Sequence, residues 1–115
     1  MSNEAPILSY TSEFKRSLRQ LAKRYRQVKN DVTPLLQALA KGGTLGERIQ
    51  GVNGTLYKVR LKNTDSRKGK RGGYRVIYYL QNEQHIILLT IYSKQEQSDI
   101  SSGELRQLLD KYLNS

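Results

Sequence analysis

The residues with the clearest potential for chemistry are cations around the segment RKGKRGGYR, residues 67–75. Eight lysine and arginine side chains lie between Lys58 and Arg75, against a single acid, Asp65. Like charges this close repel one another, so the cluster destabilises the fold unless an anion binds among them. The cations are Lys58, Arg60, Lys62, Arg67, Lys68, Lys70, Arg71 and Arg75. This pattern predicts a site for a polyanion.

The spacing of these cations indicates how they converge. Lys58, Arg60 and Lys62 are two residues apart and alternate with apolar residues, so a strand would place them on one face. The loop at 63–73, with its glycines, leads into a second strand, and adjacent strands usually pair. We therefore expect Arg75 to join the same surface, with the loop folded back over it. A merely solvated face is the competing interpretation, and it is less favoured because strand and loop form one hairpin.

Cleavage of RNA is one reaction that a cationic site can support. It needs a base for the 2′-hydroxyl, a stabiliser for the charged phosphorane and an acid for the leaving oxygen. Arginine fits phosphate oxygens as a rigid, permanently charged fork. A lysine becomes a base only when its pKa is lowered, which neighbouring cations do. We expect slow or conditional cleavage, although this inventory does not separate a nuclease from an RNA binder.

Other reactive groups are few. His85 is the single histidine and falls at a predicted turn, which argues against a catalytic or metal-binding role. Tyr92 ends a predicted strand, where its side chain either joins the core or reaches the basic cleft. The chain has no cysteine, which excludes disulfides and thiolate metal sites. We expect neither a metal nor a small-molecule cofactor.

Composition limits the class of protein. The 115 residues suffice for one domain, residues 1–115, and carry a net charge of +10. That excess favours a polyanionic partner: nucleic acid, an acidic protein or an anionic membrane. No apolar run is long enough to span a bilayer, and the first residues lack a signal pattern. A soluble, cytoplasmic protein is expected.

Two helices are predicted in the first half, after a short strand at 6–10. Thr11 or Ser12 caps the first helix, whose apolar stripe continues to Val28. The other face of this helix is basic. It is either an ordinary solvent-exposed surface or a surface that attracts RNA. Thr33 and Pro34 are predicted to begin the second helix, which the glycine pair 42–43 would end.

The second half is predicted to be mostly strands. They lie at 55–63, 74–80 and 86–92, the last apolar on both faces and therefore central. Ser101 and Glu104 fit a capping box that begins a final helix. The order is βααβββα, an α+β domain with a small, mostly antiparallel sheet packed by an N-terminal helical hairpin and a C-terminal helix.

The segments KGKRGGYRVIYYL and LLTIYSKQEQSDIS, in this frame of elements, resemble the RelE/ParE superfamily of toxins from type II toxin–antitoxin systems. The similarity is greatest to HigB-type toxins related to RelE and extends over nearly the whole chain. The resemblance implies a RelE-like fold and an mRNA interferase, an endoribonuclease that cuts translated mRNA in the A site of the 70S ribosome. It also implies a cognate antitoxin that covers or distorts the basic site.

The resemblance implies roles for individual residues. Lys58 is the candidate base, Arg60 and Arg75 stabilise the phosphate and transition state, and Tyr92 is the substitute for the acid. Where RelE has an arginine and a tyrosine, this chain has Gln95 and Ser101, and the histidines of some HigB enzymes have no counterpart. The residues expected to grip RNA are Lys62, Arg67, Lys68, Lys70, Arg71 and Lys94. The alternatives are a ParE-like poison of DNA gyrase and a non-catalytic RNA-binding module.

Overall fold

The computed structural model describes residues 5–66 and 72–114. In chain order its elements are β1 (Ile7–Tyr10), α1 (Ser12–Arg24), α2 (Val28–Ala40), β2 (Glu47–Arg48), β3 (Leu56–Leu61), β4 (Tyr74–Asn82), β5 (His85–Ser93) and α3 (Ser102–Leu113). The predicted α+β architecture is confirmed, and the two-residue strand β2 adds to the predicted order. None of the helices described is long and apolar enough to cross a membrane.

One five-stranded sheet organises the molecule, with the strand order β1-β5-β4-β3-β2. β1 pairs with β5 in parallel, and the three other pairings are antiparallel. The predicted hairpin of β3 and β4 is confirmed. β5 lies between β1 and β4, as its apolar sequence predicted.

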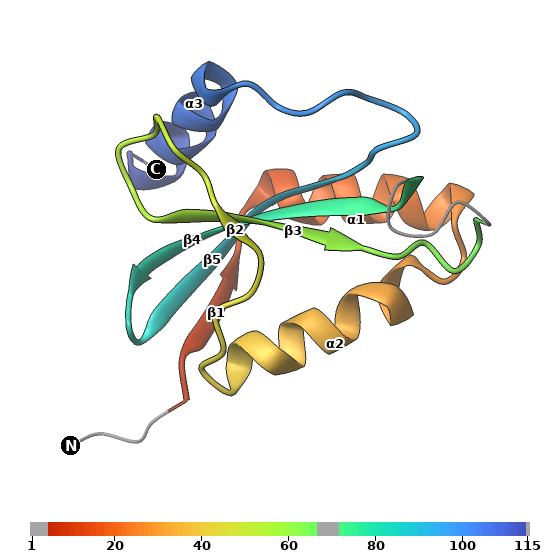
Figure 1. Cartoon of the computed structure of the whole chain (residues 1–115), viewed down its shortest axis with the longest axis horizontal. Coiled ribbons are helices and arrows are strands. Elements are labelled where there is room, and N and C mark those ends of the chain that lie inside the picture. Colours follow the sequence, from red (N-terminus) through yellow and green to blue (C-terminus); the bar gives the residue numbers. More distant parts are fainter. Residues whose placement is uncertain (1–4, 67–71, 115) are drawn as a thin grey trace.

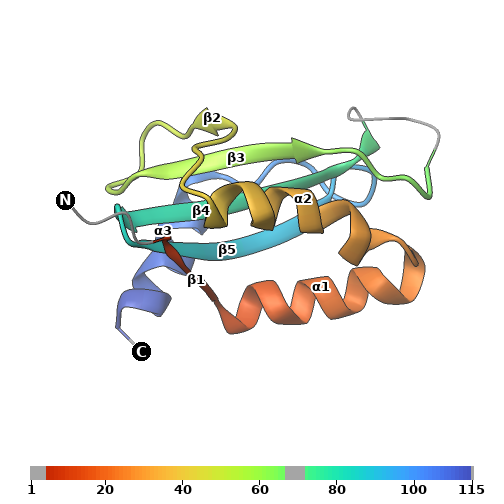
Figure 2. The same cartoon turned by 90° about the horizontal axis from the view of Figure 1, so that it is seen from below.

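Helices cover both faces of the sheet, with α2 and α3 on opposite sides in Figure 1. Residues of α1 and α2 pack against one face, here called the hairpin face, which carries Val59 and Val76 among others. α3 packs against the other, here called the α3 face, where Leu105 and Leu109 contact residues such as Ile77. Figure 2 shows α1 and α2 side by side along the sheet. The predicted packing by a helical hairpin and a C-terminal helix is confirmed.

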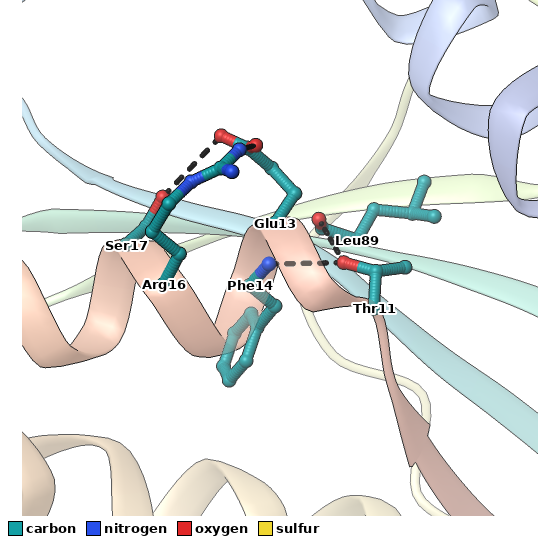
Figure 3. Close-up of polar contacts among 6 residues, drawn as sticks. All are labelled: Thr11, Glu13, Phe14, Arg16, Ser17 and Leu89. Carbon is teal, nitrogen blue, oxygen red and sulfur yellow. Dashed lines mark hydrogen bonds and ion pairs between the residues drawn. The ribbon is translucent and has the colours of Figure 1, made fainter.

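Thr11 begins α1 and fastens it to the sheet (Figure 3). Its hydroxyl oxygen accepts a hydrogen bond from the Phe14 amide at 2.9 Å and donates one to the Leu89 carbonyl at 2.8 Å. Glu13, in the first turn, pairs with Arg16 and lies where the helix dipole favours an acid. Of the two predicted caps, Thr11 is therefore the one used.

The prediction that one helix continues to Val28 is wrong. α1 ends at Arg24, and Tyr25 has an extended backbone while its ring packs edge-on against Tyr74. Asp65 then accepts a hydrogen bond from the Gln27 amide at 2.8 Å, just before α2 begins. Apolar spacing alone cannot show this break, because it depends on contacts with residues far along the chain.

The prediction that Thr33 and Pro34 begin the second helix is also wrong, since both lie inside α2. The Thr33 hydroxyl donates to the Lys29 carbonyl at 2.7 Å instead of capping a helix. An internal proline removes one helical hydrogen bond and normally costs about 3 kcal/mol. Burial of one apolar stripe outweighs this cost in α2; its members are Val28, Val32, Leu35 and Leu39.

A bulge in β5 changes which residues face each side. Tyr78 of β4 pairs with Leu88, whereas the preceding Ile77 pairs with Thr90, so Leu89 is an extra residue in β5. Strict alternation from Leu88 would place Tyr92 on the hairpin face. The extra residue shifts the alternation, and Tyr92 lies on the α3 face, paired with Arg75.

Candidate active site

Three neighbouring strands contribute one residue each to a row across the α3 face. Arg60 of β3 pairs with Arg75 of β4, which pairs with Tyr92 of β5. Lys58 lies two residues before Arg60, on the same face of β3. The prediction that Arg75 joins Lys58 and Arg60 on one surface is confirmed.

Arg60 and Arg75 are held close by the hydrogen-bond pattern of the hairpin. The Leu80 amide donates to the Thr55 carbonyl at 2.8 Å, so alternate pairs from there are hydrogen-bonded and the pair of arginines is not. Pairs of that second type have the closer Cα atoms, about 4.5 Å apart. Like charges directly opposite one another in a sheet are destabilising. The fold therefore places two arginines directly opposite one another at close range.

The two arginines differ in exposure. Arg60 is exposed, whereas Arg75 is only 5% exposed and its Nη1 donates to the Tyr74 carbonyl at 3.2 Å. A buried guanidinium is restricted in orientation, and its planar fork of donors fits the geometry of oxyanions. Arg75 is thus a fixed cation at the base of the row, and Arg60 is an accessible one beside it.

Asp99, in the segment between β5 and α3, is the centre of a second group. Its Oδ1 accepts a hydrogen bond from the Tyr92 hydroxyl at 3.1 Å. The same oxygen lies 3.2 Å from Lys94 Nζ and 3.8 Å from Lys58 Nζ. We call the combined group the cationic site; its members are Lys58, Arg60, Arg75, Tyr92, Lys94 and Asp99.

The contacts at Asp99 shift two pKa values. Partial burial would raise the pKa of Asp99, but hydrogen bonds from Lys94 and Tyr92 and the charge of Lys58 outweigh it and lower the pKa below its usual value. Burial, followed by the hydrogen bond to Asp99 and its charge, raises the pKa of Tyr92 to about 12, although the charge of Arg75 opposes this. At neutral pH Asp99 is therefore a carboxylate and Tyr92 a protonated hydroxyl donor.

Lys62, another predicted RNA-binding residue, borders this group. It follows β3, is exposed, and lines a groove of about 450 Å³ together with Lys58 and Arg60 and with Leu35 and Leu45. The other four lie outside the described residues; they are Arg67, Lys68, Lys70 and Arg71. Gly73, at the end of that basic segment, has a structural reason to be glycine, because a Cβ there would lie 1.9 Å from the Leu61 carbonyl oxygen.

Gln95 and Ser101, which the resemblance matches to an arginine and a tyrosine of RelE, make structural contacts. The Gln95 side-chain amide donates to Ser66 Oγ at 2.7 Å and to the Gly72 carbonyl at 3.0 Å, and these two residues flank the basic segment. Ser101 is the N-cap of α3, accepting from the Glu104 amide at 3.2 Å as the predicted capping box requires. Both positions thus stabilise the framework around the cationic site.

Sequence reasoning missed Asp99. The sequence predicted no role for Asp99, yet its carboxylate lies within 4 Å of two lysines of the cationic site. The signal was present in the SD pair that ends the segment IYSKQEQSD, but nothing in its spacing showed which side chain it would meet. His85 lies at the opposite end of β5, beside Asn82. Among residues 5–66 and 72–114, no group of three His, Cys, Asp or Glu is placed to hold a metal.

Comparison with known proteins identifies the family. A family model described as the RelE toxin of the RelE/RelB toxin–antitoxin system matches residues 14–112. The fold is similar to that of a mutant of the E. coli toxin RelE in the free state, with a TM-score of 0.52, 15% identity and 96% of each chain covered. It is also similar to TrmO from Pseudomonas aeruginosa, with a TM-score of 0.50 and 18% identity, over 80% of this chain and 37% of TrmO. At these identities both structures show a shared fold alone. Since the family model spans nearly the whole chain, the protein belongs to the RelE family of toxins from toxin–antitoxin systems.

Proposed function

We propose that this toxin is a ribosome-dependent endoribonuclease that cuts translated mRNA in the ribosomal A site and thereby inhibits translation. The observation that carries the proposal is the direct pairing of Arg60 with Arg75 on an open sheet face. Two arginines in this arrangement repel one another unless an anionic group lies between them. A backbone phosphate of mRNA meets that requirement, and the RelE family includes endoribonucleases.

The proposed reaction is attack of an RNA 2′-oxygen on the adjacent phosphorus. Lys58, in its neutral form, accepts the proton of the 2′-hydroxyl, and the new O–P bond gives a charged phosphorane. Arg60 and Arg75 stabilise that charge. The bond from phosphorus to the 5′-oxygen then breaks as Tyr92 supplies a proton, which leaves a 2′,3′-cyclic phosphate and a 5′-hydroxyl. The Tyr92 hydroxyl is protonated at neutral pH, as this role requires.

The ribosome has a specific part in this proposal. A tyrosine with a pKa of about 12 is a weak acid, so the site's own groups give little acid–base catalysis. Holding the 2′-oxygen, phosphorus and leaving oxygen in line contributes to rate independently of pKa. Binding of mRNA in the A site supplies that alignment. We therefore propose that the toxin cuts RNA on the ribosome and leaves free RNA intact.

Membership of the family implies an antitoxin partner. We propose that the antitoxin neutralises the toxin by covering or distorting the cationic site. Exposed cations in and beside that site, Arg60 and Lys62 among them, favour a partner with acidic side chains at the contact. The chain's net charge of +10 would further accelerate that association.

Primer extension on a reporter mRNA in a translating extract tests the proposal. Wild-type toxin is expected to give new RNA ends only within the translated region, and blocking initiation should remove them. New ends on untranslated RNA would contradict dependence on the ribosome. No new ends, with replication arrested first in cells, would support the ParE-like alternative, and a supercoiling assay with DNA gyrase would then follow. Salt-sensitive RNA binding without new ends would indicate a non-catalytic module.

A further inference from the structure

The three contacts of Asp99 converge on one oxygen atom. Tyr92 donates its hydroxyl proton to Oδ1 at 3.1 Å, and the Lys94 and Lys58 ammonium nitrogens lie 3.2 and 3.8 Å from the same atom. The donors come from different places: Lys58 from β3, Tyr92 from β5 and Lys94 from the segment after β5. A single carboxylate oxygen therefore fixes the relative positions of three groups assigned to the reaction or to RNA binding.

Anchoring of the loop does not by itself account for Asp99. The segment from Ser93 to Ser101 is already held at other points, by Gln95 to Ser66 and Gly72 and by the ion pair of Glu96 with Arg24. Its end is fixed by the N-cap of α3. The Asp99 side chain is itself 51% exposed, so it contributes little apolar burial to the fold. What it adds is contact with the reactive side chains.

The chemistry of these contacts favours a role in orientation. A tyrosine hydroxyl has one proton, which Tyr92 donates to Asp99 in this structure. For Tyr92 to act as the acid, that proton has to turn from Asp99 to the leaving oxygen once RNA is bound, while Asp99 keeps the hydroxyl in place. Each ammonium has three protons, so a lysine held by one of them keeps two for other acceptors. The Lys58 and Lys94 side chains are 25% and 32% exposed, which leaves part of each ammonium accessible to a phosphate.

We propose that Asp99 is a positioning residue of the active site, which holds the Tyr92 hydroxyl, the Lys58 side-chain nitrogen and the Lys94 ammonium group in the arrangement that cleavage requires. This inference rests on the proposed endoribonuclease function. Because Asp99 is an anion among phosphate-binding cations, it also weakens the attraction of RNA. Asp99 thus increases the rate of the chemical step at some cost in affinity.

The test is single-turnover cleavage of mRNA on programmed 70S ribosomes, with toxin in excess. Asp99→Asn should lower the maximal rate about ten- to a hundredfold, the range expected when reacting groups lose alignment. The toxin concentration that gives half the maximal rate should stay unchanged or fall, because one negative charge has been removed. Partial loss of folded toxin would instead raise the apparent half-maximal concentration and leave the saturated rate unchanged. A lower maximal rate without a higher half-maximal concentration is therefore the signature.

Two further variants serve as controls. Glu96→Gln removes the same charge from the same segment, but its partner is Arg24 on α1, so both parameters should stay close to wild type. Asp99→Glu restores the carboxylate and should recover much of the lost rate. A wild-type rate in Asp99→Asn would overturn the proposal, as would equal losses in Asp99→Asn and Glu96→Gln.

A second readout does not depend on cleavage. The pKa of Tyr92 is raised to about 12, partly by its bond to Asp99, and NMR of carbon-13-labelled tyrosine reports it directly. In Asp99→Ala that pKa should fall, whereas in Glu96→Gln it should not move. An unchanged Tyr92 signal would contradict the proposed contact. If wild type fails to cleave, the proposed function fails, and this measurement still decides whether Asp99 holds Tyr92.

Discussion

At the scale of single residues, Tyr92 shows how its neighbours determine its chemistry. Its ring is buried beside Arg75, and only its hydroxyl approaches solvent-exposed groups, through Asp99. No local sequence pattern shows which face of the sheet Tyr92 occupies, because the bulge at Leu89 places it on the α3 face. The contacts of Asp99 could not be predicted either, because Asp99 and Lys58 are 41 residues apart in the chain.

Tyr92→Phe tests the hydroxyl alone, because phenylalanine keeps the buried ring. If Tyr92 supplies the proton to the leaving oxygen, the variant should cleave about a hundredfold more slowly on ribosomes. Loss of one hydrogen bond should lower the free energy of unfolding by only about 1 kcal/mol. Single-turnover cleavage and urea unfolding measure the two effects. Cleavage at the wild-type rate would remove Tyr92 from the mechanism.

Asp99 also predicts a dependence of stability on pH. Its pKa is lowered in the folded state, so its contribution is fully present above the unfolded value near 3.8 and disappears as pH falls through the folded value. Because the side chain is half exposed, that contribution should stay below about 1 kcal/mol. Urea unfolding of wild type and Asp99→Asn should therefore differ at pH 7 and converge below pH 3.8. A difference that grows on acidification would contradict the contacts described for Asp99.

At the scale of elements, the hairpin of β3 and β4 supports the site. It was predictable, because alternation of cations and apolar residues in β3 and the aromatic, β-branched sequence of β4 are local signals. The ends of α1 and α2 were not, because Asp65, in the loop after β3, helps to set the start of α2. The short strand β2 was missed for a similar reason: Glu47 and Arg48 form a strand only through pairing with β3.

Gly73 is the position where the hairpin of β3 and β4 is most sensitive to an added side chain. In Gly73→Ala the new Cβ would lie 1.9 Å from the Leu61 carbonyl oxygen, so β3 and β4 would have to separate. We expect a loss of at least about 2 kcal/mol in the free energy of unfolding, together with loss of cleavage. Gly103→Ala is the matched control, because its Cβ would meet only side-chain atoms at 3.9 Å or more, in a helix. That variant should be neutral or more stable; equal stability of both variants would contradict the packing of Gly73.

At the scale of the whole molecule, charge is distributed over two opposite surfaces. The cationic site lies on the α3 face, whereas the exposed cations of α1, such as Arg19, lie over the hairpin face. Composition predicted a polyanionic partner but could not say which surface meets it, because both are basic. The pairing of Arg60 with Arg75 distinguishes the α3 face, because it opposes two like charges directly. The closer resemblance to HigB-type toxins stays a prediction.

The salt dependence of RNA binding separates the two surfaces. For a short single-stranded RNA, each phosphate contact contributes about 0.7 to the slope of log affinity against log salt concentration. Arg60→Ala should make the slope shallower by about that amount. Arg19→Ala should leave it unchanged, because we assign the outer face of α1 to solvent. A larger effect of Arg19→Ala would mean that RNA meets α1.

The most direct test of the central claim is the rate of mRNA cleavage on purified, programmed 70S ribosomes, measured for wild type, Arg75→Ala and Arg19→Ala. Arg75→Ala should cleave at least about a hundredfold more slowly, as for loss of one stabiliser of transition-state charge. Its fold should persist, because removing Arg75 also removes its repulsion of Arg60. Arg19→Ala should cleave like wild type. Full activity of a folded Arg75→Ala, or equal losses in both variants, would contradict an active site built on the paired arginines.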